Sequence, residues 1–333
     1  MRKALVCSPL LRIDEARAVE KLDGYLRNAF AEHGGAAALL GLSGGIDSAL
    51  LATIAVRALG ASRVRAAYLY DQHSAPGLRR NARKVAGWLG LELEEASIEP
   101  PMRQAGVYSS YAMRLTSFAG ALNRLLHGAY RARAGEAPFV ALLRTGGAET
   151  SVANARDRGR PSTIRQLEAA FNARHIYRRR ALEKEAAARN CFLLGAANRT
   201  EWLTGWFVQG GVDDLPHQPL KGLYKSQIWQ LGAFLQVPAE VLAAIPSPDM
   251  MKGITDEFAL GMSYGNIDLA LDFLEGGLTA QEVAEAGVIK EQIDRVDEMK
   301  RLSAWKRSSS QLPPPVDGGP SGGLRLSRKG SST

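Results

Sequence analysis

The chain has 333 residues, enough for one large domain or two small ones, and its 46% hydrophobic and 23% charged residues are typical of a soluble globular protein. Two cysteines exclude a disulfide framework and a four-cysteine zinc site, and no apolar run approaches the roughly 18 residues needed to span a membrane. The net charge of +8 suits an anionic ligand, and the short N-terminal stretch is no signal peptide, so we expect a cytoplasmic protein.

The first hundred residues alternate between helical and strand patterns. Apolar spacing typical of an amphipathic helix covers residues 13–33, and apolar runs of strand length follow at 37–42, 64–70 and 91–98. Helical segments at about 47–59 and 76–89 separate these runs. Such alternation predicts an α/β fold with a parallel, doubly wound sheet covered on both faces, in which ligands bind beyond the carboxyl ends of the strands.

A turn built from glycine, serine and aspartate follows the first of these strands. Its residues are Gly41, Ser43, Gly44, Gly45, Asp47 and Ser48. A helix N-terminus exposes backbone N–H groups that favour a bound phosphate, and glycines let the backbone approach the anion. The spacing is neither GxxxxGK[ST] nor GxGxxG. The alternative interpretation is a plain strand–helix turn in which Asp47 or Ser48 is only an N-cap.

The alternation breaks at residue 100. From there to about residue 161 the sequence is rich in Gly, Ser and Arg, with one expected helix at Tyr111–Tyr130 and, near its end, the segment Thr145–Ser151 and arginines at 156, 158 and 160. Long irregular segments inside compact domains are usually functional lids or disordered. We favour a lid, because anionic substrates would explain the arginines.

A long helix is expected at about Thr163–Arg189. One stripe along it is apolar except for Arg174 and Arg178, and these arginines need a partner such as a bound phosphate if they face the protein. A competing alanine-rich stripe through Ala170 leaves both arginines solvated, and the sequence favours neither stripe. A buried strand at Cys191–Ala197 follows this helix.

Helices at about 222–236, 263–275, 279–286 and 289–306 complete the expected domain, which spans residues 1–307 with an insertion at about 100–161. From residue 308 the chain is rich in Ser, Pro and Gly. It carries too little apolar surface to offset its ordering entropy, so we expect 308–333 to be a disordered tail.

Four further blocks follow the strand at 191–197. They read Glu-x-x-Thr-Gly-aromatic-Phe from Glu201, Leu-Lys-Gly-Leu-x-Lys-Ser-Gln from Leu220, Ile-Pro-Ser-Pro-Asp from Ile245 and Asp-Glu-x-x-Leu-Gly-x-x-Tyr-x-x-Ile-Asp from Asp256. The glycine turn, Ser-Gly-Gly-x-Asp-Ser, is similar to the pyrophosphate loop of the N-type ATP pyrophosphatases. Together with the four blocks in this order, it closely resembles the NAD+ synthase family over roughly residues 20–98 and 165–307.

The resemblance implies the adenine nucleotide alpha hydrolase-like fold and a two-step reaction that uses ATP and Mg2+. In that reaction the carboxylate of deamido-NAD attacks the α-phosphate of ATP, giving an acyl adenylate and pyrophosphate. Ammonia then displaces AMP and leaves NAD+. A carboxylate is a poor electrophile, and adenylation gives it a good leaving group. The remaining task of the protein is mainly to position the reactants and neutralise charge on the phosphates.

The resemblance also implies roles for individual positions. The expected ATP-binding residues are Gly41, Ser43, Gly44, Gly45, Asp47, Ser48, Lys225 and Ser247, and the expected metal ligands are Asp47 and Glu201. Asp47, Lys225 and Asp213, an acid near the reacting carboxyl, are the expected catalytic residues. The positions expected to bind deamido-NAD are Asn172, Arg174, Arg178, Asp213 and Lys306.

Three of these residues have structural alternatives. Glu201 could form a capping box with Asn198, Lys225 could be a solvated lysine in the first turn of a helix, and Asp213 could be a loop residue that makes its own turn. The sequence also departs from the family where the dinucleotide would bind. Trp305 stands where the family usually has His, and the N-x-K-A-R-x-R helix motif has altered spacing.

The family further implies a homodimer, and we expect neither a nucleic acid nor a membrane as partner. Only about forty residues precede the glycine turn, too few for a glutaminase domain, so ammonia is expected to come from free ammonium or a separate protein. Two other functions stay open. One is an ATP pyrophosphatase that amidates or ligates a different carboxylic acid, and the other is a nucleotide-binding module without turnover.

Overall fold

The fold is built on one parallel sheet. The structure, a computed structural model, describes residues 7–109, 120–135, 137–144, 163–248 and 253–307. Within these ranges the strands are β1 (Ala37–Gly41), β2 (Val64–Tyr70), β3 (Leu93–Ser97) and β4 (Cys191–Leu194), in the order β3-β2-β1-β4. Leu39 of β1 is in register with Arg65 on one side and Leu193 on the other.

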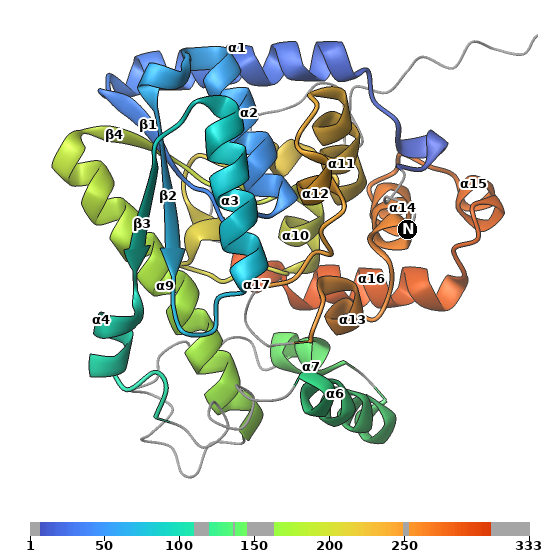
Figure 1. Cartoon of the computed structure of the whole chain (residues 1–333). Coiled ribbons are helices and arrows are strands. Elements are labelled where there is room, and N and C mark those ends of the chain that lie inside the picture. Colours follow the sequence, from blue (N-terminus) through green and yellow to red (C-terminus); the bar gives the residue numbers. More distant parts are fainter. Residues whose placement is uncertain (1–6, 110–119, 136, 145–162, 249–252, 308–333) are drawn as a thin grey trace, which may run out of the picture.

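Helices cover both faces of the sheet because successive side chains of a strand point to opposite faces. Ala38 and Leu40 of β1 belong to a cluster with buried residues of α1 (Glu15–His33), α2 (Ile46–Leu59) and α3 (Pro76–Leu89). The intervening Leu39 packs in a second cluster with Leu182 and Ala186 of α9 (Thr163–Arg189). This arrangement confirms the predicted doubly wound α/β fold (Figure 1).

Local signals explain why the predicted bounds of these elements agree with the structure. Asp14 caps α1 by accepting a hydrogen bond from the Arg17 amide at 3.0 Å, and Gly34 ends the helix in the left-handed conformation. Pro76 occupies the first turn of α3 and Gly90 ends it. The N-cap of α2 is Gly45, without a side-chain cap, so the alternative in which Asp47 or Ser48 is the cap is wrong.

The segment after β3 holds more helix than the sequence pattern indicated. The described helices there are α4 (Glu99–Gln104), α6 (Gly120–Ala134) and α7 (Pro138–Arg144). The prolines of α4 lie in its first turn, where their missing N–H groups cost no hydrogen bond, so they begin a helix and do not break one. The expected helix at Tyr111–Tyr130 overlaps α6, while 110–119, Thr145–Ser151 and the arginines at 156, 158 and 160 lie outside the described residues.

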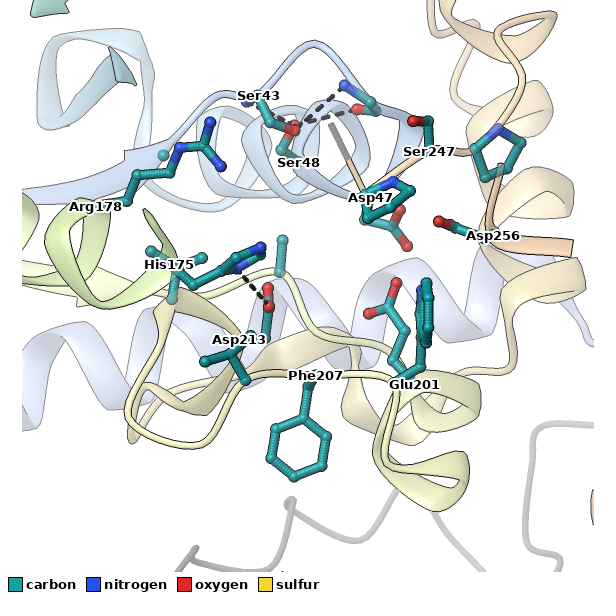
Figure 2. Close-up of a pocket in the computed structure, with 18 of the residues that line it drawn as sticks. Ser43, Asp47, Ser48, His175, Arg178, Glu201, Phe207, Asp213, Ser247 and Asp256 are labelled. Atoms are coloured by element: carbon teal, nitrogen blue, oxygen red, sulfur yellow. Dashed lines mark hydrogen bonds and ion pairs between the residues drawn. The ribbon is translucent and has the colours of Figure 1, made fainter. Parts of the chain in front are cut away.

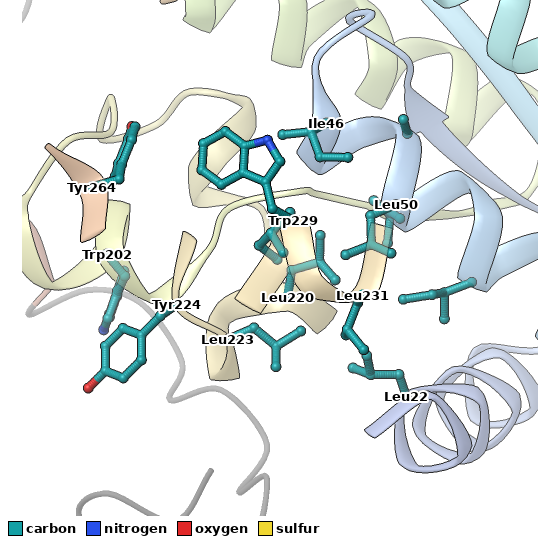
Figure 3. Close-up of a cluster of buried hydrophobic side chains, with 14 of the residues drawn as sticks. Leu22, Ile46, Leu50, Trp202, Leu220, Leu223, Tyr224, Trp229, Leu231 and Tyr264 are labelled. Carbon is teal, nitrogen blue, oxygen red and sulfur yellow. The ribbon is translucent and has the colours of Figure 1, made fainter. Parts of the chain in front are cut away.

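The described chain after β4 consists of helices and loops that add to the main core. Its elements are α10 (Arg199–Thr204), η3 (Val212–Asp214), η4 (Pro219–Gly222), α11 (Lys225–Phe234), α12 (Ala239–Leu242), α13 (Asp256–Leu260), α14 (Tyr264–Leu274), α15 (Ala280–Glu285), α16 (Lys290–Leu302) and α17 (Ala304–Arg307). Two short 3-10 helices lie earlier in the chain: η1 (Pro9–Leu11) before α1 and η2 (Ala61–Arg63) before β2. Figure 3 shows Trp229 and Leu231 of α11 beside Leu50 of α2 in the main core. None of the helices described is long and apolar enough to cross a membrane. The expected tail, 308–333, lies outside the described ranges.

The strand order determines where a ligand can bind. The chain moves outward from β1 to β2 and β3, then returns to place β4 on the other side of β1. At such a reversal the loops that leave two neighbouring strands diverge and open a crevice beyond their carboxyl ends. The glycine turn leaves β1 and the Asn198 segment leaves β4 at this point.

Candidate active site

A cavity of about 390 Å³ lies at this crevice. The β1–α2 turn and the segment after β4 form two of its walls, and α9, α7 and the loop at 244–248 are among the other segments that line it. In Figure 2, Ser43, Asp47 and Ser48 lie across the cavity from Glu201 and Asp213. The expected site residues Gly41, Ser43, Gly45, Asp47, Ser48, Asn172, Arg178, Glu201, Asp213, Lys225, Ser247 and Lys306 all line this cavity.

The glycine turn is held by its own serines. The Ser43 amide donates to Ser48 Oγ at 3.1 Å, and Ser48 Oγ donates to the carbonyl of Gly45 at 3.1 Å. Gly44 has a φ of +84°, and a Cβ there would lie 2.0 Å from the carbonyl oxygen of Leu78. Only glycine fits this position, and the first-turn N–H groups of α2 have no side-chain cap, which leaves an anion-binding surface at the helix N-terminus.

Lys225 connects the glycine turn to the opposite wall. Its ammonium forms an ion pair with Asp47 Oδ2 and lies 3.7 Å from Glu201 Oε1. Its side chain is 3% exposed, so the alternative of a solvated first-turn lysine is wrong. Burial disfavours its charged form, but Asp47 and Glu201 outweigh that effect and raise the pKa of Lys225. The lysine is therefore a fixed positive charge beside the cavity.

Asn198 joins the two loops at the strand ends. Its side chain caps α10 by accepting from the Glu201 amide at 3.0 Å, and Glu201 Oε2 accepts from the Asn198 amide at 3.2 Å. The Nδ2 group of Asn198 also donates to Asp47 Oδ1 at 2.8 Å. The capping box considered for Glu201 is thus present, and the same carboxylate faces the cavity.

The charges around Lys225 do not balance. Burial raises the pKa of Glu201 well above its usual range, and Lys225 only partly opposes this shift. The negative charges of Asp47, Asp213 and Asp256 add to it. Burial likewise raises the pKa of Asp256 to about 6. One ammonium among several carboxylates leaves an excess of negative charge, which a bound cation would relieve.

The donor set fits Mg2+ better than a metal that the protein ligates alone. In the part of the chain that the structure describes, no group of three or more His, Cys, Asp or Glu side chains could hold a metal ion. Asp47 and Glu201 supply two carboxylates, which leaves the other positions of an octahedral ion to phosphate oxygens and water. Asp256 had no expected role, although it opens the last of the four sequence blocks. It lines the cavity and accepts a hydrogen bond from the Tyr264 hydroxyl at 2.9 Å.

Asp213 faces a histidine on the opposite element. Its Oδ2 lies 3.2 Å from Nδ1 of His175 on α9. The neighbouring Asp214 accepts a hydrogen bond from the Gly210 amide at 2.9 Å and so makes the turn that was considered for Asp213. That alternative is therefore wrong. No role was expected for His175, because its only signal in the sequence is its position three residues before Arg178 on a predicted helix.

The two arginines of α9 have different environments. Arg174 is fully buried and forms two hydrogen bonds with the equally buried Asp71, one of them 2.7 Å long between Nη2 and Oδ1. The expectation that Arg174 binds deamido-NAD is wrong. A bound phosphate was expected to neutralise this buried arginine, but Asp71, directly after β2, does so instead. Arg178 lines the cavity and donates to the Leu69 carbonyl at 3.3 Å, whereas the alternative stripe left both arginines solvated.

The cavity wall beside Lys306 is aromatic. Lys306 donates to the carbonyls of Gly205 and Phe207, at 2.9 and 2.7 Å. Trp305, beside it in the cavity wall, donates to the carbonyl of Leu143 on α7 at 3.4 Å. Phe139 of α7 also lines the cavity, so the described part of the expected lid contributes directly to the pocket. Ser247 lies on the loop at 244–248 and donates to the carbonyl of Ile254 at 3.2 Å.

Comparison with known proteins gives this cavity a family context. A model of the NAD synthase family matches residues 18–133 and 151–310, and residues 134–150 lie outside the match. The chain is 32% identical over 256 residues to the NH3-dependent NAD+ synthetase of Thermotoga maritima, which covers 77% of this chain and 86% of that protein. It is 26% identical over 303 residues to the protein of the same name from Methanosarcina mazei, covering 90% of this chain and 99% of that one.

Solved structures agree on the fold. The NMN synthetase of Francisella tularensis has a TM-score of 0.64 and 24% identity, covering 91% of this chain and 99% of that chain. The NH3-dependent NAD synthetase of Campylobacter jejuni has a TM-score of 0.60 and 21% identity, covering 92% and 100%. The family model and the curated relatives extend over most of this sequence. The chain belongs to the NAD synthase family.

Proposed function

We propose that this chain is an ammonia-dependent NAD+ synthase, a ligase that forms a carbon–nitrogen bond. It uses ATP to adenylate the carboxylate of deamido-NAD and then ammonia to displace AMP. One observation carries the proposal: the glycine turn, which includes Asp47, lines a single cavity together with Lys225 and Glu201. An anion-binding helix end beside a fixed ammonium and two carboxylates suits a metal-bound triphosphate.

We assign ATP to the glycine-turn side of this cavity. Gly41, Ser43, Gly45 and Ser48, which line the cavity, would hold the phosphates together with the adjoining Gly44, and Lys225 and Ser247 line the cavity from other elements. Asp47 and Glu201 would ligate Mg2+, whose charge would offset the excess of carboxylates and stabilise the departing pyrophosphate. The metal supplies this charge, and the chain supplies the position of each reactant.

We assign deamido-NAD to the side of α9 and the aromatic wall. Asn172, Arg178, Asp213 and Lys306 line that part of the cavity. The deamido-dinucleotide is itself a polyanion, so Arg178 and Lys306 would contribute favourable charge. Arg174 is left out of this assignment because Asp71 already neutralises it.

Domain organisation, oligomeric state and ammonia source form the second part of the proposal. We propose that residues 1–307 form a single catalytic domain whose insertion, at about 100–161, builds one wall of the pocket through α7. We also propose that the enzyme works as a homodimer in the cytoplasm, with free ammonium or a separate glutaminase as the ammonia source. Light scattering of the purified full chain tests the dimer, since a monomer mass at working concentration would contradict it.

An AMP-release assay tests the reaction. We expect AMP and pyrophosphate only when deamido-NAD, ATP, Mg2+ and ammonium are all present. Asp47→Asn and Glu201→Gln should abolish AMP formation while their unfolding curves stay cooperative. AMP release with another carboxylic acid, and none with deamido-NAD, would assign the chain to a ligase of different substrate. ATP binding by calorimetry without any AMP release would assign it to a binding module.

A further inference from the structure

Amide formation releases a proton that the residues assigned so far do not accept. The lone pair of ammonia forms the C–N bond to the acyl carbon, the C–O bond to the AMP phosphate breaks, and its electron pair leaves with AMP. The new nitrogen must then lose one proton to become a neutral amide. If ammonium enters the site, a further proton must leave before attack. A base that reaches the attacking nitrogen is therefore needed.

His175 offers such a base in the cavity wall. Its side chain is 14% exposed, and its Nδ1 lies 3.2 Å from Asp213 Oδ2, within ion-pair distance although not aligned as a hydrogen bond. Its Nε2 is buried and has no hydrogen-bond partner among the described residues. Buried polar atoms normally have partners, so an unpaired ring nitrogen beside a ligand cavity indicates that the ligand supplies one.

The chain packs the ring closely at this place. A Cβ on Gly211 would lie 2.9 Å from Cβ of His175, so the glycine allows the loop with Asp213 to approach α9. The side chains of His175 and Asp213 point toward each other in the cavity wall (Figure 2). The pairing thus follows from the fold of two elements that are far apart in the sequence.

We propose that His175 accepts the proton released during amide formation, with Asp213 orienting it through Nδ1. The inference rests on the proposed function, because it needs the acyl adenylate and ammonia. The Asp213 carboxylate, 3.2 Å from Nδ1, electrostatically favours a proton on that nitrogen, and this tautomer leaves the Nε2 lone pair free. Imidazole is also the side chain whose ordinary pKa lies nearest to neutral pH, which suits a general base.

Charged residues of both signs belong to the two elements that meet at His175. Asp213 approaches it from η3, where Asp214 is the next residue, and Arg178 and Arg179 follow it on α9. Arg179 donates to the Asp214 carbonyl at 3.1 Å, which keeps positive charge next to the η3 aspartates. Burial lowers the pKa of Lys221 of η4 to about 8, although Asp214 and Asp213 oppose this shift.

Separate assays of the two half-reactions test the proposal with the full chain. Deamido-NAD-dependent exchange of labelled pyrophosphate into ATP, without ammonium, reports adenylation alone. We expect His175→Ala and His175→Gln to keep this exchange within about threefold, while kcat for NAD+ formation falls by about 10²-fold or more. His217→Gln is the matched control, because that ring packs on Phe192 outside the cavity and should change neither rate.

Two further readouts identify proton transfer. The residual amidation rate of His175→Ala should rise with pH over the range in which the unmodified enzyme is level, and added imidazole should restore part of it. Hydroxylamine, which is largely unprotonated at neutral pH, should be used by the variant with a smaller loss than ammonium. A steric or binding role would move KM and would leave these dependences unchanged.

The outcomes separate the two proposals. Equal losses of exchange and amidation in both variants, with a cooperative unfolding curve, would overturn the role of His175 while leaving the synthase intact. Unchanged NAD+ formation would overturn it as well. A wild-type chain that shows no exchange with deamido-NAD would instead contradict the proposed function itself.

Discussion

Replacing Arg174 with methionine separates a structural arginine from a substrate contact. Arg174 and Asp71 are both fully buried, and two hydrogen bonds join them. Removing one partner of a buried pair leaves an uncompensated charge, which costs about 3–5 kcal/mol. We therefore expect Arg174→Met to lower the free energy of unfolding by about that amount, with KM for ATP and deamido-NAD unchanged in the folded enzyme.

The loss of unfolding free energy in Arg174→Met should depend on pH. In the native chain burial raises the pKa of Asp71, but Arg174 and Arg178 outweigh it and hold the pKa below its usual value. Without Arg174, burial would dominate and the carboxyl would favour its protonated form. The unfolded chain would then release that proton more readily than the folded one. The destabilisation should accordingly be largest at neutral pH and shrink as the solution is acidified.

Urea unfolding, followed by tryptophan fluorescence at neutral and acidic pH, measures both effects. Arg189→Met is the matched control, since Arg189 forms exposed ion pairs near the end of the same helix and should cost at most about 1 kcal/mol. The double variant Asp71→Asn/Arg174→Met should recover part of the stability by removing the unpaired charge. A normal unfolding energy together with a raised KM would refute the structural role of Arg174.

Three other substitutions test the glycine turn, the carboxylate cluster and the loop junction. Gly44→Ala should raise KM for ATP by tenfold or more, whereas Gly45→Ala, with no atom nearer its new Cβ than 3.5 Å, should have a smaller effect; equal effects would contradict the close-approach argument. Burial raises the pKa of Asp256 to about 6, so its ionisation opposes folding as pH rises. Asp256→Asn should therefore add about 1–3 kcal/mol of unfolding free energy at neutral pH and little near pH 4, and a loss at neutral pH would contradict this. Asn198→Ala should cost about 1–2 kcal/mol through the lost cap and should lower AMP formation through Asp47, and an unaffected rate would show that Asn198 only caps α10.

The fold was largely predictable because its signals are local. Apolar runs of strand length alternated with helical spacing, and Asp14, Pro76 and Gly90 stand at helix ends where capping rules place such residues. The helices at 99–104 and 138–144 were not predicted. Prolines that begin α4 look like breakers in the sequence, and α7 is too short to show a helical period.

The site was predictable where residues follow one another and less so where the fold brings them together. The glycine turn is a contiguous motif, and its expected members other than Gly44 line one cavity. The partners of Arg174 and His175 could not be inferred, because Asp71 and Asp213 lie on other elements, one of them 103 residues away. A helical stripe shows which side chains share a face but not what lies opposite that face.

Lys225, at the start of α11, makes the stability of the folded site independent of a metal ion. Lys225 already neutralises part of the carboxylate cluster from within the chain, and Asn198 ties the two loops together without any ion. The scaffold of the site is therefore assembled without ATP or the proposed Mg2+. A chelator should stop turnover at once yet leave the urea midpoint of the nucleotide-free enzyme nearly unchanged. In this respect the enzyme differs from small zinc domains, which unfold when their ion is withdrawn.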